Sequence, residues 1–303
     1  MSLPLVLTDE IRAAQRAGRP IVALESTIIT HGMPTPENLA TARAVEADVR
    51  AEGAVPATIA VLAGAIHVGL NADALAGLAA TKDVKKLSRA DLAQAIVCRA
   101  TGSTTVAATM ICAHLAGIGV FATGGIGGVH RGAEYSFDVS ADLQELARTP
   151  VTVVSAGAKA ILDLPKTLEM LETLGVPVCG YRTAELPAFW SRDSGLAVPL
   201  RADSADAIAA MQKMRCRLGL SGGLLVVNPI PAGAEIPAAE IAPVIDAAIA
   251  EAKAAGISGK AVTPYLLARI GAATQGRALA ANIALVRENA RLAAALARAM
   301  QAA

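Results

Sequence analysis

The chain has 303 residues, of which 54% are hydrophobic, 17% are charged and only 2% are aromatic, and its formal net charge is +1. This balance creates no global field that would attract nucleic acid or an anionic membrane, and the few aromatic rings offer little surface on which exposed bases could stack. The length suffices for a substantial aliphatic core, and we expect a single domain over residues 1–303.

Apolar runs and helical patterns alternate along the first half of the chain. Glu25 lies near the carboxyl end of the first expected long strand, and Ser88 is expected to cap a helix. The small residues from Gly102 are expected to begin a further helix. The other expected elements are helices over 8–17, 36–52 and 72–80 and strands over 20–27 and 55–62.

A glycine-rich loop at residues 124–132 follows an apolar strand expected over 118–122 and contains five glycines. Glycines let backbone N–H groups approach an anion closely. Asp138 and Ser140 come next, before a helix expected from Asp142. Because the loop matches neither the dinucleotide fingerprint nor the P-loop, we expect a phosphate or metal–phosphate site of another kind.

The second half continues the alternation, which predicts an α/β fold with parallel strands. Lys159 and Asn228 fall at the carboxyl ends of expected strands. Residues 186–203, with Trp190, are the least regular segment and are expected to form a flap or an oligomer contact. The remaining expected elements are strands over 150–159, 176–181 and 222–229 and helices over 167–174, 238–255 and from residue 264 onward.

Glu25, the glycine-rich loop, Lys159 and Asn228 all follow apolar strands. In an open parallel sheet, ligands bind outside the carboxyl ends of the strands. We therefore expect these groups to meet in one cleft.

Neither secretion nor a membrane span is expected. The start of the chain lacks the basic and long apolar regions of a secretory signal, so we expect a cytoplasmic protein. Residues 100–130 carry no Asp, Glu, Lys or Arg, but glycine and hydroxyl residues interrupt them, which favours a buried helix and strand. The four cysteines form no Cys-x-x-Cys pair, and we expect buried free thiols.

The residue types in the expected cleft suit acid–base and imine chemistry. Lys159, between small and apolar residues, is either a solvated side chain or a nucleophile whose free amine forms an imine. Glu25 is either a buried acceptor or a general acid. Asp138 and Asp142 are candidate oxygen ligands of a hard divalent ion, although Asp142 also suits an ordinary helix start. Lys85 and Lys86 are not distinguished, and solvated lysines are the commoner case.

Several ordered blocks of the sequence closely resemble the pseudouridine-5'-phosphate glycosidase family. The resemblance extends over nearly the whole chain and is carried by residues 22–34, 53–60, 121–146, 156–163, 222–231 and 281–286. It departs at residues 287–289, where this chain has Arg-Glu-Asn and relatives often carry an Asn-Asn pair.

The resemblance implies reversible cleavage of the C–C glycosidic bond of pseudouridine 5'-phosphate to uracil and ribose 5-phosphate. It also implies a three-layer α/β/α fold with a central, largely parallel sheet, a homotrimer, and one divalent ion per subunit, usually Mn²⁺. In this resemblance Lys159 matches the nucleophile, Glu25 the proton donor and Asp138 the metal ligand. The substrate-binding positions match Lys86, Val106, Ser140, Ala141, Asp142 and Asn282.

Two alternatives stay open at this point. A Schiff-base aldolase or lyase acting on another sugar phosphate would use the same lysine, acid and phosphate loop. A non-catalytic sugar-phosphate sensor would bind ligand in the same cleft but would tolerate the loss of Lys159. The sequence does not decide the metal's identity or the physiological direction of the reaction.

Overall fold

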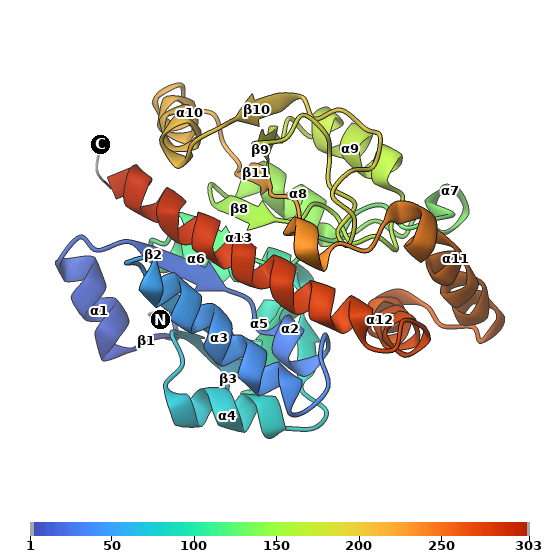
Figure 1. Ribbon diagram of the computed structural model, residues 1–303. Helices are drawn as coiled ribbons and strands as arrows, with labels where there is room; N and C mark the ends of the chain where they lie inside the picture. The colour runs from blue at the N-terminus through green and yellow to red at the C-terminus, as the bar shows by residue number, and fades with distance from the viewer. Residues whose placement is uncertain (1–2, 302–303) are drawn as a thin grey trace.

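The computed structural model describes residues 3–301, which are built around one large β-sheet (Figure 1). Within these residues the sheet has eleven strands: β1 Leu5–Leu7, β2 Ile21–Leu24, β3 Val55–Leu62, β4 Ala65–Val68, β5 Lys85–Leu87, β6 Gly102–Thr104, β7 Val120–Ala122, β8 Thr152–Ser155, β9 Val178–Tyr181, β10 Leu200–Ala202 and β11 Leu224–Val227.

The same residues form thirteen α-helices and three short 3₁₀ segments. The α-helices are α1 Asp9–Arg16, α2 Thr27–Thr30, α3 Glu37–Ala51, α4 Ala72–Ala80, α5 Leu92–Val97, α6 Val106–Leu115, α7 Ala133–Ser136, α8 Ala141–Arg148, α9 Leu164–Thr173, α10 Ala205–Arg217, α11 Ala238–Ala254, α12 Val262–Ala273 and α13 Arg277–Gln301. The 3₁₀ segments are η1 Arg89–Asp91, η2 Ala232–Ala234 and η3 Gly259–Ala261.

The sheet is mostly parallel, as the alternating sequence pattern predicts. Its strand order is β1-β4-β3-β2-β7-β8-β11-β9-β10, with β6 pairing with β3 and β5. Only the pairs β3–β4 and β3–β6 are antiparallel among the described residues. Leu24 pairs with Ala122, Ala122 with Val154, and Ser155 with Val227. The carboxyl ends of β2, β7, β8 and β11 therefore lie level at one edge.

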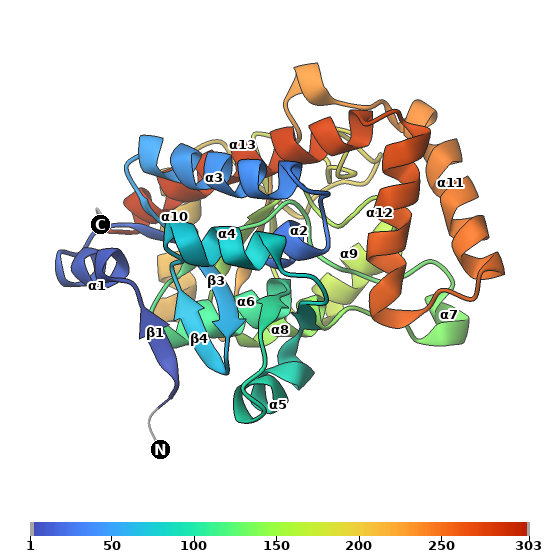
Figure 2. The same cartoon turned by 90° about the horizontal axis from the view of Figure 1, so that it is seen from below.

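Helices cover both faces of this sheet, which confirms the expected α/β/α layers. On one face α13 contacts β2, β7 and β8 and packs beside α3 and α10. On the other face α6 contacts β2, β3 and β7 and packs beside α8. Figure 2 shows α3 and α13 on one side and α6 and α8 on the other. Because both faces are covered, the central strands are mostly apolar, and β8 and β11 are buried at every residue.

Most of the expected helices and strands form, but the helix expected from Gly102 is wrong at its start. Residues 102–104 form β6, and α6 begins at Val106 after Thr105, whose hydroxyl accepts a hydrogen bond from the Ala108 N–H at 3.4 Å. A Cβ at Gly102 would lie 2.5 Å from Leu87 Cδ1, so glycine permits the close approach of β6 to β5.

The segment over residues 186–203 is packed into the molecule at Trp190, which is only 1% exposed. The indole N–H of Trp190 donates to Asn282 Oδ1 at 2.6 Å and to the Ala278 carbonyl at 3.2 Å, both on α13. The ring of Phe189 meets that of Trp190 edge-on, with centroids 5.2 Å apart. This part of the segment is therefore a fixed wall and not a free flap.

Burial accounts for the uncharged stretch and for two of the four cysteines. Residues 100–130 include β6, α6 and β7, which are mostly buried, as expected. No helix in the part of the chain that the structure describes is both long enough and apolar enough to cross a membrane. Cys112 and Cys179 are buried free thiols, and burial raises the pKa of Cys112 to about 12. Cys98 and Cys216 are exposed, so the expectation is wrong for these two.

Candidate active site

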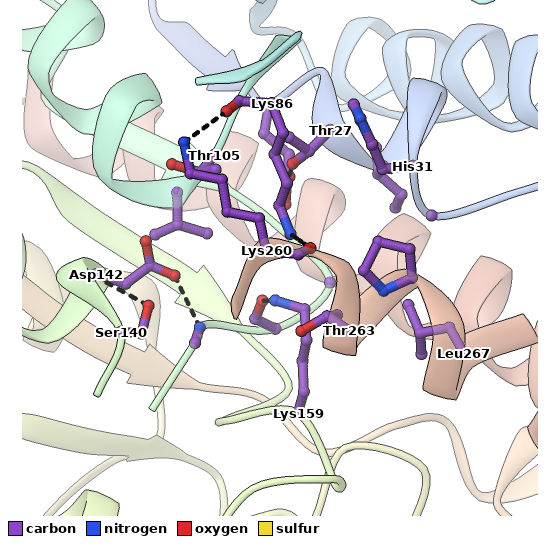
Figure 3. Close-up of a pocket in the computed structure, with 18 of the residues that line it drawn as sticks. Thr27, His31, Lys86, Thr105, Ser140, Asp142, Lys159, Lys260, Thr263 and Leu267 are labelled. Atoms are coloured by element: carbon purple, nitrogen blue, oxygen red, sulfur yellow. Dashed lines mark hydrogen bonds between the residues drawn. The ribbon is translucent and has the colours of Figure 1, made fainter. Parts of the chain in front are cut away.

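A cavity of about 360 Å³ is formed by segments that lie beyond the level strand ends. Figure 3 shows side chains from segments far apart in the sequence converging on it. The structure brings all the residues of the predicted site to this cavity, namely Glu25, Lys86, Val106, Asp138, Ser140, Ala141, Asp142, Lys159 and Asn282. Their individual roles stay predictions.

Asn228, which we expected in the same cleft, is not among the residues that line it. Its side-chain amide donates to Asn289 Oδ1 on α13 at 3.1 Å. Asn289 in turn donates to the Thr123 carbonyl at 2.9 Å. Asn228 follows β11 directly, but Asn289 of α13 lies between it and Thr123. Its amide therefore supports the start of the glycine-rich loop indirectly, through Asn289.

Lys159 follows β8 after a short turn, because the strand already ends at Ser155. Its backbone N–H donates to the Ile126 carbonyl at 3.1 Å, and its amine donates to the Gly125 carbonyl at 2.6 Å. A Cβ at Gly125 would lie 2.7 Å from the ring of Phe189. Glycine at this position therefore lets the loop run between Lys159 and the aromatic wall.

Glu25 lies directly after β2, where its carboxylate accepts hydrogen bonds from two threonine hydroxyls. Thr27 donates to Oε2 and Thr123 donates to Oε1. Thr123 directly precedes the glycine-rich loop, and Thr27 begins α2. Two donors from separate segments fix the orientation of the carboxylate in the cavity wall.

Asp142, which is 6% exposed, connects three segments of the cavity through its carboxylate. Oδ1 accepts from the Ala107 N–H in the first turn of α6 at 2.9 Å, and Oδ2 accepts from the Gly127 N–H at 2.8 Å. Ser140 caps α8 by accepting from the Asp142 N–H at 3.2 Å. A Cβ at Gly127 would clash with the Ser140 side chain. Each carboxylate oxygen thus accepts one backbone N–H, and a metal-ligand role for Asp142 stays a prediction.

This arrangement also explains why Val106 and Ala141 line the cavity, since each is the first residue of its helix. The amino-terminal ends of α6 and α8 thus face the same space. Partial positive charge at helix amino termini favours an anion there.

Lys86 brings a cation to that end of the cavity. Side chains alternate along β5, so Lys85 is exposed while Lys86 is partly buried and lines the cavity. Burial lowers the pKa of Lys86, and the positive charge of Lys159 lowers it further, whereas Glu25 and Asp142 act in the opposite direction. These effects place Lys86 in one electrostatic environment with both candidate catalytic residues.

Asp138 faces the cavity next to His130, with 4.0 Å between its Oδ2 and His130 Nδ1. Burial lowers the pKa of His130, which Asp138 raises and the two lysines of the site lower, so neutral imidazole is favoured. Within residues 3–301 no group of three or more His, Cys, Asp or Glu side chains is arranged to hold a metal ion. A single carboxylate suits a hard ion whose other ligands are water and a phosphate of the substrate. It does not suit an ion coordinated by protein side chains alone.

Several lining residues were missed from the sequence. Asn282 was predicted, but Phe189, which lines the cavity, was not placed at the site, nor was Trp190, which binds Asn282 without lining the cavity. Lys260 and Thr263, from η3 and α12, complete another wall. No motif marks Lys260, and the only local signal is the pair of glycines at 256 and 259 that precedes the helix.

The family follows from comparison with known sequences. The chain matches the family described as indigoidine synthase A like protein over residues 10–299. The chain belongs to this family. Relatives named pseudouridine-5'-phosphate glycosidase match at full length, which confirms the resemblance seen in the sequence blocks. The one from Paracoccus denitrificans is 68% identical over 300 residues, which are 98% of this chain and 99% of that relative. The one from Jannaschia sp. is 65% identical over 300 residues, covering 99% of each.

Two solved structures of related proteins share the fold. The prealnumycin C-glycosynthase AlnA, in complex with ribulose 5-phosphate, is 40% identical with a TM-score of 0.92, covering 100% of this chain and 98% of that chain. An indigoidine synthase A (IdgA)-like protein from Thermotoga maritima is 34% identical with a TM-score of 0.90, covering 99% and 97%.

Proposed function

We propose that this protein is a pseudouridine-5'-phosphate glycosidase, which reversibly cleaves the C–C glycosidic bond of pseudouridine 5'-phosphate to uracil and ribose 5-phosphate. The observation that carries the proposal is one cavity lined by the amine of Lys159, the carboxylate of Glu25 and a cationic end at Lys86. Full-length relatives named for this activity, at 68% and 65% identity, support the same reaction.

The chemistry explains why an amine and an acid are both needed. Uracil joined through carbon leaves poorly, because the electron pair of the broken bond remains on its ring carbon until that carbon is protonated. A nitrogen bonded to the former anomeric carbon solves this problem. Its lone pair forms the C=N bond of an iminium while the bond from that carbon to uracil breaks. An acid must also protonate the ring oxygen when the sugar opens.

In the proposed mechanism the neutral amine of Lys159 attacks C1' of the sugar while the C1'–O4' bond breaks. Protonated Glu25 gives its proton to O4', which becomes a hydroxyl group. Ionised Glu25 takes a proton from the nitrogen now bonded to C1', which frees the nitrogen lone pair. This lone pair forms an iminium with C1' as the bond to uracil breaks, and the uracil carbon takes the proton from Glu25. Water then adds to the iminium and gives a proton to Glu25, and the resulting carbinolamine breaks down to release ribose 5-phosphate and restore the amine.

Lys86, Ser140 and the amino termini of α6 and α8 bind the phosphate in this proposal. Binding there fixes the sugar so that C1' lies against Lys159. Asn282, held by Trp190, lines the same cavity and binds the substrate away from the phosphate end.

We further propose one divalent ion, Mn²⁺ in the first instance, held by Asp138 together with water and the substrate. Such an ion would supply positive charge beside the phosphate and orient the substrate. We also retain the expectations of a homotrimer and a cytoplasmic protein as proposals.

The direct test is uracil release from pseudouridine 5'-phosphate over a range of manganese concentrations and with chelator. We expect metal-dependent release by the wild type and a higher manganese requirement for Asp138→Asn, but not for Asp206→Asn on α10. Unchanged metal dependence in Asp138→Asn would remove this residue as the ligand. A folded wild type that binds ribose 5-phosphate without releasing uracil would contradict the proposal and direct attention to the aldolase or sensor alternatives.

A further inference from the structure

The cavity wall formed by η3 and the start of α12 is attached to β5 through two lysines. The Lys86 amine donates to the Lys260 carbonyl at 3.4 Å, and the Lys260 amine donates to the Lys86 carbonyl at 3.3 Å. Figure 3 shows each of the two side chains extending toward the segment that carries the other. Each lysine therefore binds the backbone of the segment that carries the other.

Asp91 anchors this attachment at the end of η1. Its Oδ2 accepts from the Lys260 amine at 2.6 Å and from the Ser88 N–H at 2.8 Å. Burial raises the pKa of Asp91, but the Lys260 and Ser88 hydrogen bonds outweigh burial and lower it below its usual range. Asp91 is therefore ionised at neutral pH and holds the ammonium group of Lys260.

The wall also contacts other helices of the fold. α12 packs against α11, α13 and η3. Gly256 and Gly259 have positive φ angles of 68° and 58°, so the chain from α11 turns at Gly256 and again at Gly259, the first residue of the wall. Thr263 and Leu267 on this wall line the cavity. The hydrogen bonds of Lys260 with Asp91 and Lys86 connect this wall to β5 and η1.

We propose that Lys260 is a positioning residue for phosphate binding. Its ion pair with Asp91 holds the η3–α12 wall over the cavity, and its backbone carbonyl keeps the Lys86 amine aimed at the phosphate of the substrate. The inference rests on the proposed function, because it assigns Lys86 to the phosphate of ribose 5-phosphate. A direct contact between the Lys260 amine and the phosphate is the competing explanation.

The test compares Lys260→Met, Lys260→Arg, Asp91→Asn and the double variant Asp91→Asn/Lys260→Met, with Lys253→Met on α11 as the matched control. Asparagine at position 91 keeps an oxygen for the Ser88 N–H but loses the charge. Hydrogen exchange of residues 259–267 is measured together with calorimetric binding of ribose 5-phosphate and the kcat and KM of uracil release.

We expect faster exchange in residues 259–267 for Lys260→Met and for Asp91→Asn, and no change for Lys253→Met. Because a partly exposed ion pair contributes up to about 1 kcal/mol, each variant should weaken ribose 5-phosphate binding and raise KM about fivefold, with kcat little changed. The double variant should bind no more weakly than either single one, and Lys260→Arg should restore both exchange and binding.

Wild-type exchange in residues 259–267 of Lys260→Met would overturn the attachment. Wild-type affinity in Asp91→Asn with weak binding in Lys260→Met would overturn the positioning role in favour of a direct contact. If the wild type releases no uracil, the proposed function fails, while the exchange and binding results still decide the role of Lys260.

Discussion

At the scale of single residues, the structure explains how one carboxylate is fixed for acid–base chemistry. The side-chain donors that bind the Glu25 carboxylate are the neutral hydroxyls of Thr27 and Thr123, which orient it. Thr123 is itself held through its carbonyl by Asn289. The support of the acid therefore extends from the cavity wall to the buried face of α13.

Replacing Thr123 with valine removes one of the two donors and leaves the side-chain volume nearly unchanged. Because a hydrogen bond to a charged group contributes about 1.5–3 kcal/mol, we expect kcat to fall at least roughly tenfold. The KM should change little, since the phosphate end is unaffected. Steady-state uracil release measures both constants.

Thr123→Ser is the matched control, because it keeps the hydroxyl and should retain most of the activity. A valine variant as active as the wild type would show that the Thr123 hydroxyl does not orient the acid.

At the scale of elements, side chains alternate between the two faces of the short strand β5, so its two neighbouring lysines point in opposite directions. β5 directs Lys86 into the cavity and leaves Lys85 exposed. The pKa of Lys86 is lowered first by burial and then by the charge of Lys159. The strand pairing of β5 with β6 therefore determines which lysine meets the substrate.

This difference predicts the pH dependence of ribose 5-phosphate binding. The phosphate needs the ammonium form of Lys86, and its pKa is lowered from 10.5, so affinity should decline as pH rises through that lowered pKa. The decline therefore begins at a lower pH than for an ordinary surface lysine. Binding should also take up a proton in this range, because the phosphate favours the charged amine. Calorimetry in two buffers of different ionisation enthalpy measures both effects.

Lys86→Met should bind weakly and lose this alkaline decline, whereas Lys85→Met should retain the wild-type profile. The same decline in Lys86→Met as in the wild type would assign the titration to another group.

At the scale of the whole molecule, the sequence predicts the central sheet well, because each strand is marked by its own run of mostly apolar residues. The runs that form β2 and β11 are apolar throughout, and those of β3 and β8 contain only threonine or serine besides apolar residues, as is typical of strands covered on both faces. The residues after such strands meet at one edge, so the positions of Glu25, the glycine-rich loop and Lys159 could be predicted. The prediction was wrong for Asn228, because its side chain binds Asn289 on α13 and does not line the cavity. The order of the strands does not reveal where such a helix packs.

The remaining parts of the site depend on contacts between residues far apart in the sequence. β6 forms because Gly102 allows close packing on β5, although its small residues resemble a helix start. Lys260 meets Asp91 from 169 positions away, and Trp190 meets Asn282 from 92 positions away. Neither pairing leaves a periodic pattern or a motif. These residues could be assigned to the site only from the structure.

The most direct test of the account is borohydride reduction of the protein in the presence of ribose 5-phosphate, followed by peptide mass spectrometry. The aldehyde of the open-chain sugar should form an imine with Lys159, and reduction should fix one sugar phosphate on that residue. Lys159→Ala should carry no adduct in the cavity. Absence of an adduct on Lys159 in a wild type that binds ribose 5-phosphate, or an adduct confined to Lys86, would contradict the covalent mechanism.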